Sequence, residues 1–138
     1  MALSAMLKAA GHESEVIIDC LEKDAVKATI ASKPDIIAFS INIYEAIWMR
    51  ETGTKLRQQF AGPIICGGPH PTYLPELTLQ EEYLDAVCRG EGEDALLDYV
   101  KAIESGSETT GIPNFWVKQD GRIHENELRP LLEDLDSL

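Results

Sequence analysis

The stretch PIICGGPHPTYLPEL, residues 63–77, joins a short apolar run to a turn rich in glycine and proline. Residues 63–66 include two β-branched isoleucines, which is typical of a buried strand. The run ends at Gly67-Gly68, where the missing side chains allow close approach to the backbone. Prolines at 69, 71 and 75 then restrict the chain. The stretch predicts a strand that ends either in a tight turn or in a loop against which a ligand lies.

Short apolar runs alternate with helical segments on both sides of this stretch. We expect strands at 14–19, 35–40, 63–66 and 85–90, and helical segments at 2–11, 20–34, 41–62 and 91–106. Residues 74–83 are expected to form a short helix or an irregular crossover, and Asn42 and Glu45 a capping box. This alternation predicts an α/β fold with a doubly wound parallel sheet between helices.

The alternation of strands and helices ends near the C-terminus. Residues 114–126, NFWVKQDGRIHEN, have two apolar-rich arms around Asp120-Gly121, which predicts a β-hairpin. Residues 127–138 are acidic with scattered leucines, and we expect a linker or a docking helix there. We therefore divide the chain into an α/β domain, 1–106, and a hairpin with a linker, 107–138.

Composition restricts the class of protein. The chain has 138 residues, enough for one domain, with 44% hydrophobic and 26% charged residues, as in ordinary globular proteins. A net charge of −12 argues against nucleic acid and anionic membranes as partners. No apolar run is long enough to span a bilayer, and no secretory signal is visible. Three widely spaced cysteines, without CxxC or CxxxCxxC, indicate a reducing cytoplasm and no iron–sulfur cluster in this chain.

Ligands of parallel sheets bind beyond the carboxyl ends of the strands, so the loops there are the candidate site. Two of the three loops are rich in glycine, although glycine also ends strands without any ligand. Neither loop matches a phosphate-binding fingerprint. The candidate binding residues are Ser40, Ile41 and Asn42 after one strand, Gly67, Gly68, Pro69, His70 and Pro71 after the next, and Arg89, Gly90, Glu91, Gly92 and Glu93 after the last.

Each notable side chain also has a purely structural interpretation. His70 has no histidine partner in sequence, and we expect it to position the loop rather than to catalyse. Glu93 and Asp94 suit a helix N-terminus, while Trp48 and Trp116 are expected to cover the core. No nucleophile–base pair or metal-ligand spacing is visible. The residues alone indicate a binding domain for a sizeable neutral or mixed-charge ligand.

The motifs GGPHPTYLPE, DAVCRGEGEDALLDYV and GIPNFWVKQDGRIHENELRPLLEDLDSL occur in one order. Together they closely resemble the N-terminal cobalamin-binding domain of cobalamin-dependent radical S-adenosylmethionine enzymes, over nearly the whole chain. The resemblance implies a Rossmann-like, flavodoxin-like domain that presents cobalamin to a separate iron–sulfur catalytic barrel, usually for methyl transfer. The nucleotide tail would lie against Gly67-Gly68, flanked by Ser40 and residues 89–93. Replacing Gly68 by valine is then expected to abolish binding and leave the fold largely intact.

The sequence departs from the family pattern in two ways, and each departure leads to a further expectation. The cluster-binding CxxxCxxC is absent, so the barrel would be supplied in cis by a longer protein or in trans, and this chain alone would not be catalytic. The DxHxxG loop that supplies a histidine to cobalt in methionine-synthase-type domains is also absent, because GHESE at 11–15 follows the first helix. His12 is therefore not that ligand, and we expect base-off cobalamin without a protein histidine on cobalt.

The family domain opens with a strand that this sequence lacks before its first helix. In the flavodoxin-like order, that strand would lie between residues 14–19 and 35–40. We expect the sheet to be repaired, either by residues 14–19 closing against 35–40 or by pairing of edges in a homodimer.

Other functions remain open at this point. The same fold could be a ligand-free interaction or regulatory module. A phosphoacceptor receiver is a poor match, because no lysine follows a late strand, and a nucleotide-sugar or dinucleotide binder lacks its phosphate motif.

Overall fold

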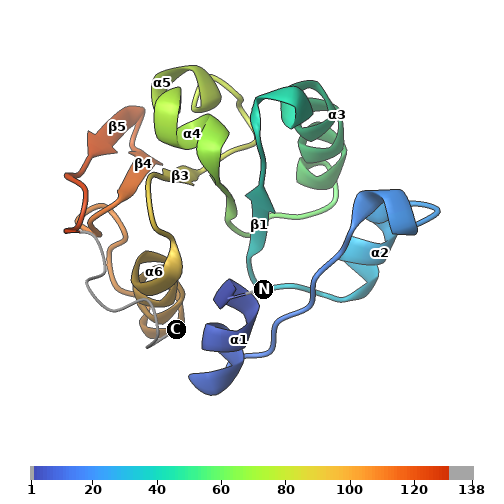
Figure 1. Ribbon diagram of the computed structural model, residues 1–138, viewed down its shortest axis with the longest axis horizontal. Helices are drawn as coiled ribbons and strands as arrows, with labels where there is room; N and C mark the ends of the chain where they lie inside the picture. The colour runs from blue at the N-terminus through green and yellow to red at the C-terminus, as the bar shows by residue number, and fades with distance from the viewer. Residues whose placement is uncertain (1, 131–138) are drawn as a thin grey trace.

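The computed structural model describes residues 2–130, and the expectation of a linker or helix at 131–138 lies outside them. A five-stranded sheet in the order β1-β2-β3-β4-β5 forms the centre of the domain (Figure 1). Strands β1 (Ile37–Ser40), β2 (Ile64–Gly67) and β3 (Ala86–Cys88) run parallel. Strands β4 (Phe115–Gln119) and β5 (Arg122–Glu125) form a hairpin that continues the sheet antiparallel to β3. The Rossmann-like α/β class is thereby confirmed, in a mixed sheet.

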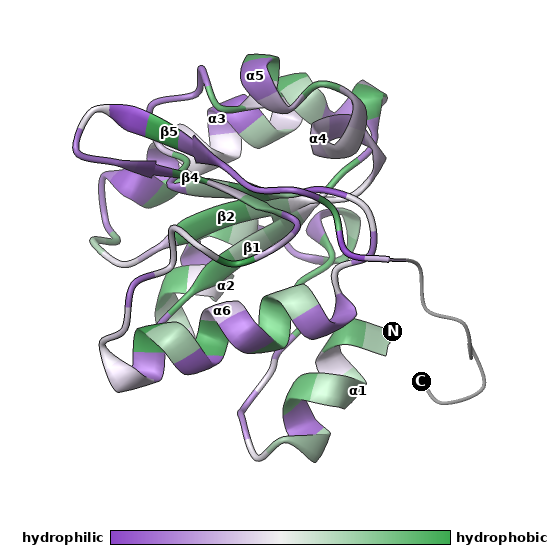
Figure 2. Ribbon diagram, turned by 90° about the vertical axis from the view of Figure 1, so that its left-hand side faces the viewer, coloured by the Kyte–Doolittle hydropathy of each residue, from purple (hydrophilic) through white to green (hydrophobic). Residues whose placement is uncertain are grey.

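Helices lie on both faces of the sheet (Figure 2). On one face lie α3 (Ala46–Arg57), α4 (Pro69–Tyr73) and α5 (Pro75–Thr78), and on the other lies α6 (Glu93–Ser105). The shorter α1 (Ala2–Ala9) contacts α6, and α2 (Ala25–Ala31) packs beside α3. No helix within residues 2–130 combines the length and apolar character needed to cross a membrane.

The alternation of side chains along the strands produces two cores. One core contains Ile37, Phe39, Ile64, Cys66 and Val87 with the buried face of α3. The other contains Ile65, Ala86 and Cys88 with residues of α6 and β4. Met49, Gly53 and Leu56 of α3 are buried. As predicted, Trp116 is buried and Trp48 packs against the first core.

The predicted strand at 14–19 is wrong. Residues 12–18 have no regular secondary structure, and a 3-10 turn, η1 (Asp19–Leu21), follows them. Val16 and Ile18 are 42% and 47% exposed. A strand is stabilised by hydrogen bonds to a neighbour, and this run pairs with no described strand. The expected closure of 14–19 against 35–40 is therefore also wrong, and β1 is the edge of the described sheet.

Several helix boundaries differ from the sequence prediction. Helix α2 starts only at Ala25, because the Asp24 carboxylate caps it by accepting a hydrogen bond from the Lys27 amide at 2.9 Å. The predicted capping box is confirmed, but it opens a 3-10 turn, η2 (Ile43–Glu45), before α3. Residues 69–73 form α4, where we expected a loop, because proline is favourable in the first helical turn.

The predicted hairpin is confirmed. Asp120 and Gly121 have φ angles of 52° and 72°, the left-handed pair that a two-residue turn requires. Because β4 pairs with β3, the hairpin is part of the same sheet as residues 37–88. The division of the chain at residue 106 remains a prediction.

Candidate functional site

The three predicted loops meet at the carboxyl edge of the parallel strands. The loop after β1 is tied to the loop after β2, because the His70 amide donates to the Ile41 carbonyl at 3.3 Å. The loop after β2 is tied to the loop after β3, because the Gly90 amide donates to Thr72 Oγ1 at 2.9 Å. Sequence reasoning brought these loops together correctly but missed Thr72 as the residue that links two of them.

The two adjacent glycines have different roles. Gly68 has φ 102° and ψ −174°, a conformation restricted almost entirely to glycine. A Cβ at Gly68 would lie 2.5 Å from the Ile41 carbonyl oxygen, so the chain itself occupies that space. A Cβ at Gly67 would meet only Cys88, at 3.8 Å. The expectation that Gly68→Val would spare the fold is therefore wrong, and Gly67 is the glycine beside unfilled space.

One face of β1 is left uncovered by the helices. Ile37 and Phe39 are buried in the first core, whereas Ala38 and Ser40 on the opposite face are exposed. Ala38 pairs with Ile65 and Ser40 with Gly67 of β2, so Ser40 and Gly67 lie side by side at the carboxyl edge. These small residues form a shallow floor, which we call the β1 floor (Ala38, Ser40 and Gly67). Ala38 was missed from sequence, although the alternation of DIIAFS places it on the same face as Ser40.

The proline–histidine segment forms α4 rather than a loop restricted by prolines. Pro69 is exposed, while His70 and Pro71 are buried. His70 is 7% exposed, and its Nδ1 has no hydrogen-bond partner among the described residues. A buried polar atom without a partner is uncommon in a native fold and indicates a ligand or an ordered water. The expectation that His70 positions the loop stays a prediction.

The loop after β3 contains one basic residue, Arg89, whose side chain packs against an aromatic ring. The Arg89 guanidinium carbon lies 4.7 Å from the centre of the Trp116 ring, a cation–π arrangement. Glu93 and Asp94 occupy the first turn of α6, where acidic side chains favour the helix dipole. Gly92 is the N-cap residue of α6, and Leu3 of α1 lies close to it.

Asn114 was also missed from sequence. It is 3% exposed and adopts φ 73°, and its Nδ2 donates to the Glu91 carbonyl at 2.7 Å. An asparagine directly before a strand is a weak sequence signal, since asparagine tolerates the left-handed region in many turns.

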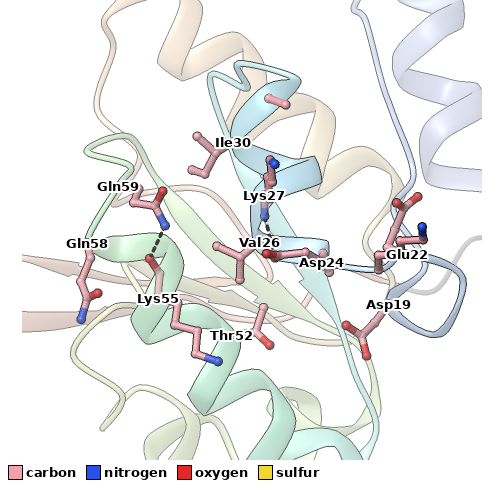
Figure 3. A pocket seen from close by; sticks show the side chains of 13 residues that line it. Asp19, Glu22, Asp24, Val26, Lys27, Ile30, Thr52, Lys55, Gln58 and Gln59 are labelled. Carbon is pink, nitrogen blue, oxygen red and sulfur yellow. Dashed lines mark hydrogen bonds between the residues drawn. The ribbon is translucent and has the colours of Figure 1, made fainter.

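A hollow lies elsewhere, between α2, α3 and residues 19–24 (Figure 3). It measures about 850 Å³, and its rim mixes acidic and basic side chains such as Asp24, Lys27 and Lys55. It contains none of the predicted site residues, and its charges do not converge on a point. Among the described residues, no group of three or more potential ligands could hold a metal ion.

The three cysteines lie on separate elements. Cys20 is exposed in η1, while Cys66 and Cys88 are buried in β2 and β3. Burial raises the pKa of the Cys66 and Cys88 thiols from 9.0 to about 12. Both are therefore protonated at neutral pH and are poor metal ligands.

Comparison with known proteins agrees with this architecture. The family model of the B12 binding domain matches residues 1–100. The chain is 32% identical over 131 residues to "Uncharacterized methyltransferase PH0819" of Pyrococcus horikoshii, covering 88% of this chain and 28% of that protein. It is 29% identical over 150 aligned positions to the anaerobic magnesium-protoporphyrin IX monomethyl ester cyclase of Rubrivivax gelatinosus, covering 99% of this chain and 26% of that one.

Solved structures show the same fold. The radical S-adenosylmethionine methyltransferase TsrM of Kitasatospora setae, solved with cobalamin and a [4Fe-4S] cluster bound, superimposes with a TM-score of 0.83 at 19% identity. That match covers 97% of this chain and 26% of TsrM. The cobalamin-dependent S-adenosylmethionine radical enzyme OxsB gives a TM-score of 0.77 at 21% identity, covering 94% and 19%. The chain thus spans about a quarter of the length of the curated relatives described above, and it belongs to the B12-binding domain family.

Proposed function

We propose that this domain binds cobalamin at the carboxyl edge of β1–β3, with the nucleotide tail against the β1 floor. The observation that carries the proposal is this uncovered floor of small residues, in which a Cβ at Gly67 would meet only Cys88. A strand of a parallel sheet is usually covered on both faces, so an open face indicates a ligand or a partner. The buried Nδ1 of His70 adds a polar group at the same edge.

The residues present fit such a ligand. Ser40 offers a hydroxyl on the floor, and Gly67 allows close approach to the backbone. Residues 41–42, 68–71 and 89–93 would surround the ligand from the three linked loops. Bound cobalamin supplies a cobalt that can carry a methyl group, while this chain's residues hold and orient the cofactor.

The test is retention of the cofactor by the full chain. We expect hydroxocobalamin to remain bound after desalting, detected by its visible absorbance. A ligand-free interaction or regulatory module of this fold would elute colourless. Colourless protein across a range of cobalamin concentrations would reject the proposal.

We further propose that cobalamin binds base-off without a protein histidine on cobalt. His12 Nδ1 lies 3.1 Å from Glu104 Oε1 at the far end of α6, and His124 lies in the β5 hairpin strand. His70 is buried within α4. An electron paramagnetic resonance spectrum of the bound cob(II)alamin should lack hyperfine splitting from a protein imidazole nitrogen, and such splitting would contradict the proposal.

We propose that the domain works with a radical S-adenosylmethionine barrel, of methyltransferase type, supplied in cis or in trans in the cytoplasm. The exposed apolar side chains at the carboxyl edge support a partner there, because Ile43, Tyr44 and Ile47 are 58%, 92% and 73% exposed. The structural neighbours TsrM and OxsB are radical S-adenosylmethionine enzymes, and this chain covers only 26% and 19% of their lengths.

A homodimer through the sheet edge is a second proposal about partners. Ile37 and Ile41 direct their amides to β2, so the amides of Ala38 and Ser40 point outward from β1. Within residues 2–130, no hydrogen bond engages these two outward amides. Size-exclusion chromatography with light scattering should show a dimer at high concentration, and a monomer at every concentration would contradict it.

A further inference from the structure

Asn114 uses all of its polar groups in hydrogen bonds, although it precedes β4 and belongs to none of the three site loops. It is 3% exposed and has a positive φ of 73°. Its backbone N–H and C=O and both polar atoms of its side chain each have a partner. A residue that is buried, conformationally unusual and fully bonded holds its neighbours in one arrangement.

Two of these bonds hold the loop after β3. The Asn114 carbonyl accepts a hydrogen bond from the Arg89 amide at 2.9 Å. The Asn114 Nδ2 donates to the Glu91 carbonyl at 2.7 Å. The loop that the proposed cofactor would contact is therefore bound at two points, 89 and 91, by one residue.

The other two bonds hold the segment 127–130. The Asn114 amide donates to the Glu127 carbonyl at 2.9 Å, and Asn114 Oδ1 accepts from the Arg129 amide at 2.6 Å. Leu128 also packs near Gly90, and a small cavity of about 60 Å³ separates this segment from the loop. The Arg129 guanidinium forms an ion pair with Asp98 of α6.

We infer that Asn114 is a positioning residue that couples the loop 89–92 to the segment 127–130. The planar amide of Asn114 cannot follow a displaced Glu91 carbonyl without moving the oxygen that receives the Arg129 amide. An ordered loop therefore orders the segment 127–130, and the reverse holds by thermodynamic reciprocity. The extension to cofactor binding, by which a loaded loop would order the segment 127–130, rests on the proposed function.

A double-mutant cycle in ligand-free protein tests the coupling directly. Thr72→Val removes the hydroxyl that accepts from the Gly90 amide and donates to the Gly68 carbonyl, and so loosens the loop between residues 89 and 91 with little change of side-chain shape. Asn114→Asp keeps an acceptor for the Arg129 amide but replaces the donor to Glu91 by a second oxygen. The probe is amide hydrogen exchange, measured at Gly90 and at Arg129 in the full chain.

In the wild-type background, Thr72→Val should accelerate exchange at both Gly90 and Arg129, by about twofold or more, the lower factor expected for the loss of one solvent-exposed hydrogen bond. In the Asn114→Asp background, the effect of Thr72→Val on Arg129 should be at least about twofold smaller, because the two side-chain bonds no longer act together. Acceleration at Gly90 without any change at Arg129, or equal changes at Arg129 in both backgrounds, would overturn the inference.

Two further variants keep the test decisive. Asn114→Gly tolerates the positive φ and removes both side-chain bonds, so it replaces Asn114→Asp in the cycle if the aspartate variant does not fold. Asp98→Asn removes only the ion pair of Arg129 and should leave the effect of Thr72→Val on the Arg129 amide intact. Loss of that effect in Asp98→Asn would assign the coupling to α6 instead of Asn114.

A further measurement, made with hydroxocobalamin present, distinguishes failure of this inference from failure of the proposed function. If hydroxocobalamin is retained, it should slow exchange at Arg129 in the wild type, and less so in the Asn114 variants. If hydroxocobalamin is not retained, the proposed function fails, while the ligand-free cycle still decides whether Asn114 couples the loop to the segment.

Discussion

Alanine substitutions at Gly67 and at Gly68, made one at a time, should distinguish a glycine that borders the proposed ligand from a glycine that the fold itself requires. Gly67→Ala adds a Cβ whose nearest neighbour is Cys88, at 3.8 Å, an ordinary van der Waals contact. Because Gly67 lies in a strand without a positive φ, alanine should change the free energy of unfolding by no more than about 1 kcal/mol. If the cofactor tail lies against Gly67, the same methyl group enters the tail's volume.

The expected loss of affinity follows from the cost of overpacking. Inserting a methyl group into a filled contact typically costs about 1–3 kcal/mol, which corresponds to a dissociation constant that is roughly 5- to 150-fold higher. Gly68→Ala should behave differently, because its Cβ would lie 2.5 Å from the Ile41 carbonyl oxygen at a φ of 102°. Backbone strain and overpacking together predict about 2–6 kcal/mol of lost folding stability there.

The assay combines urea unfolding with a spectrophotometric titration of hydroxocobalamin on the full chain. Gly111→Ala is the matched control, since its Cβ meets nothing within 4 Å and its φ is not positive. The control should change the free energy of unfolding by no more than about 1 kcal/mol, and it should leave the affinity for hydroxocobalamin unchanged. Wild-type affinity in Gly67→Ala would refute the argument and place the ligand away from the β1 floor.

Three further predictions concern the whole chain. Unfolding free energy should fall as pH rises from about 9 to 12, because the unfolded state releases the thiol protons of Cys66 and Cys88 that burial retains in the fold; urea unfolding at pH 8 and 10 checks this, and equal stability would contradict it. Reconstitution with iron and sulfide should give neither a stable four-iron cluster nor 5′-deoxyadenosine from S-adenosylmethionine, because the three cysteines lie on separate elements; a stable cluster by Mössbauer spectroscopy would show the opposite. Iodoacetamide at neutral pH should label Cys20 much faster than the two buried cysteines, measured by mass spectrometry, and equal labelling would show that the sheet opens readily.

Local patterns in the sequence were sufficient for most of the architecture. Apolar runs at 35–40, 63–66 and 85–90 became neighbouring parallel strands, because each is bounded by turn residues and followed by a crossover. Asp120-Gly121 specified its hairpin through two left-handed residues. The three loops at the carboxyl edge were found for the same reason, since parallel strands with similar connections place their ends together.

Residues 14–19 show where local pattern fails. Their β-branched composition suits a strand, but a strand exists only if a neighbour supplies hydrogen bonds, and no described strand does so. The opposite case is α4, where Pro69 and Pro71 suggested a loop. There the prolines occupy a first helical turn, in which a missing amide hydrogen costs little.

The sequence by itself determined the α/β order, the hairpin and the loops that form the candidate site, because these depend on periodicity and turn chemistry over a few residues. Only the tertiary structure decided that Gly68 makes room for Ile41 while Gly67 borders unfilled space. It also decided that Asn114 joins the loop after β3 to residues 127–129. These roles arise from contacts between segments far apart in the chain, and such contacts leave no periodic or local signal in a single sequence.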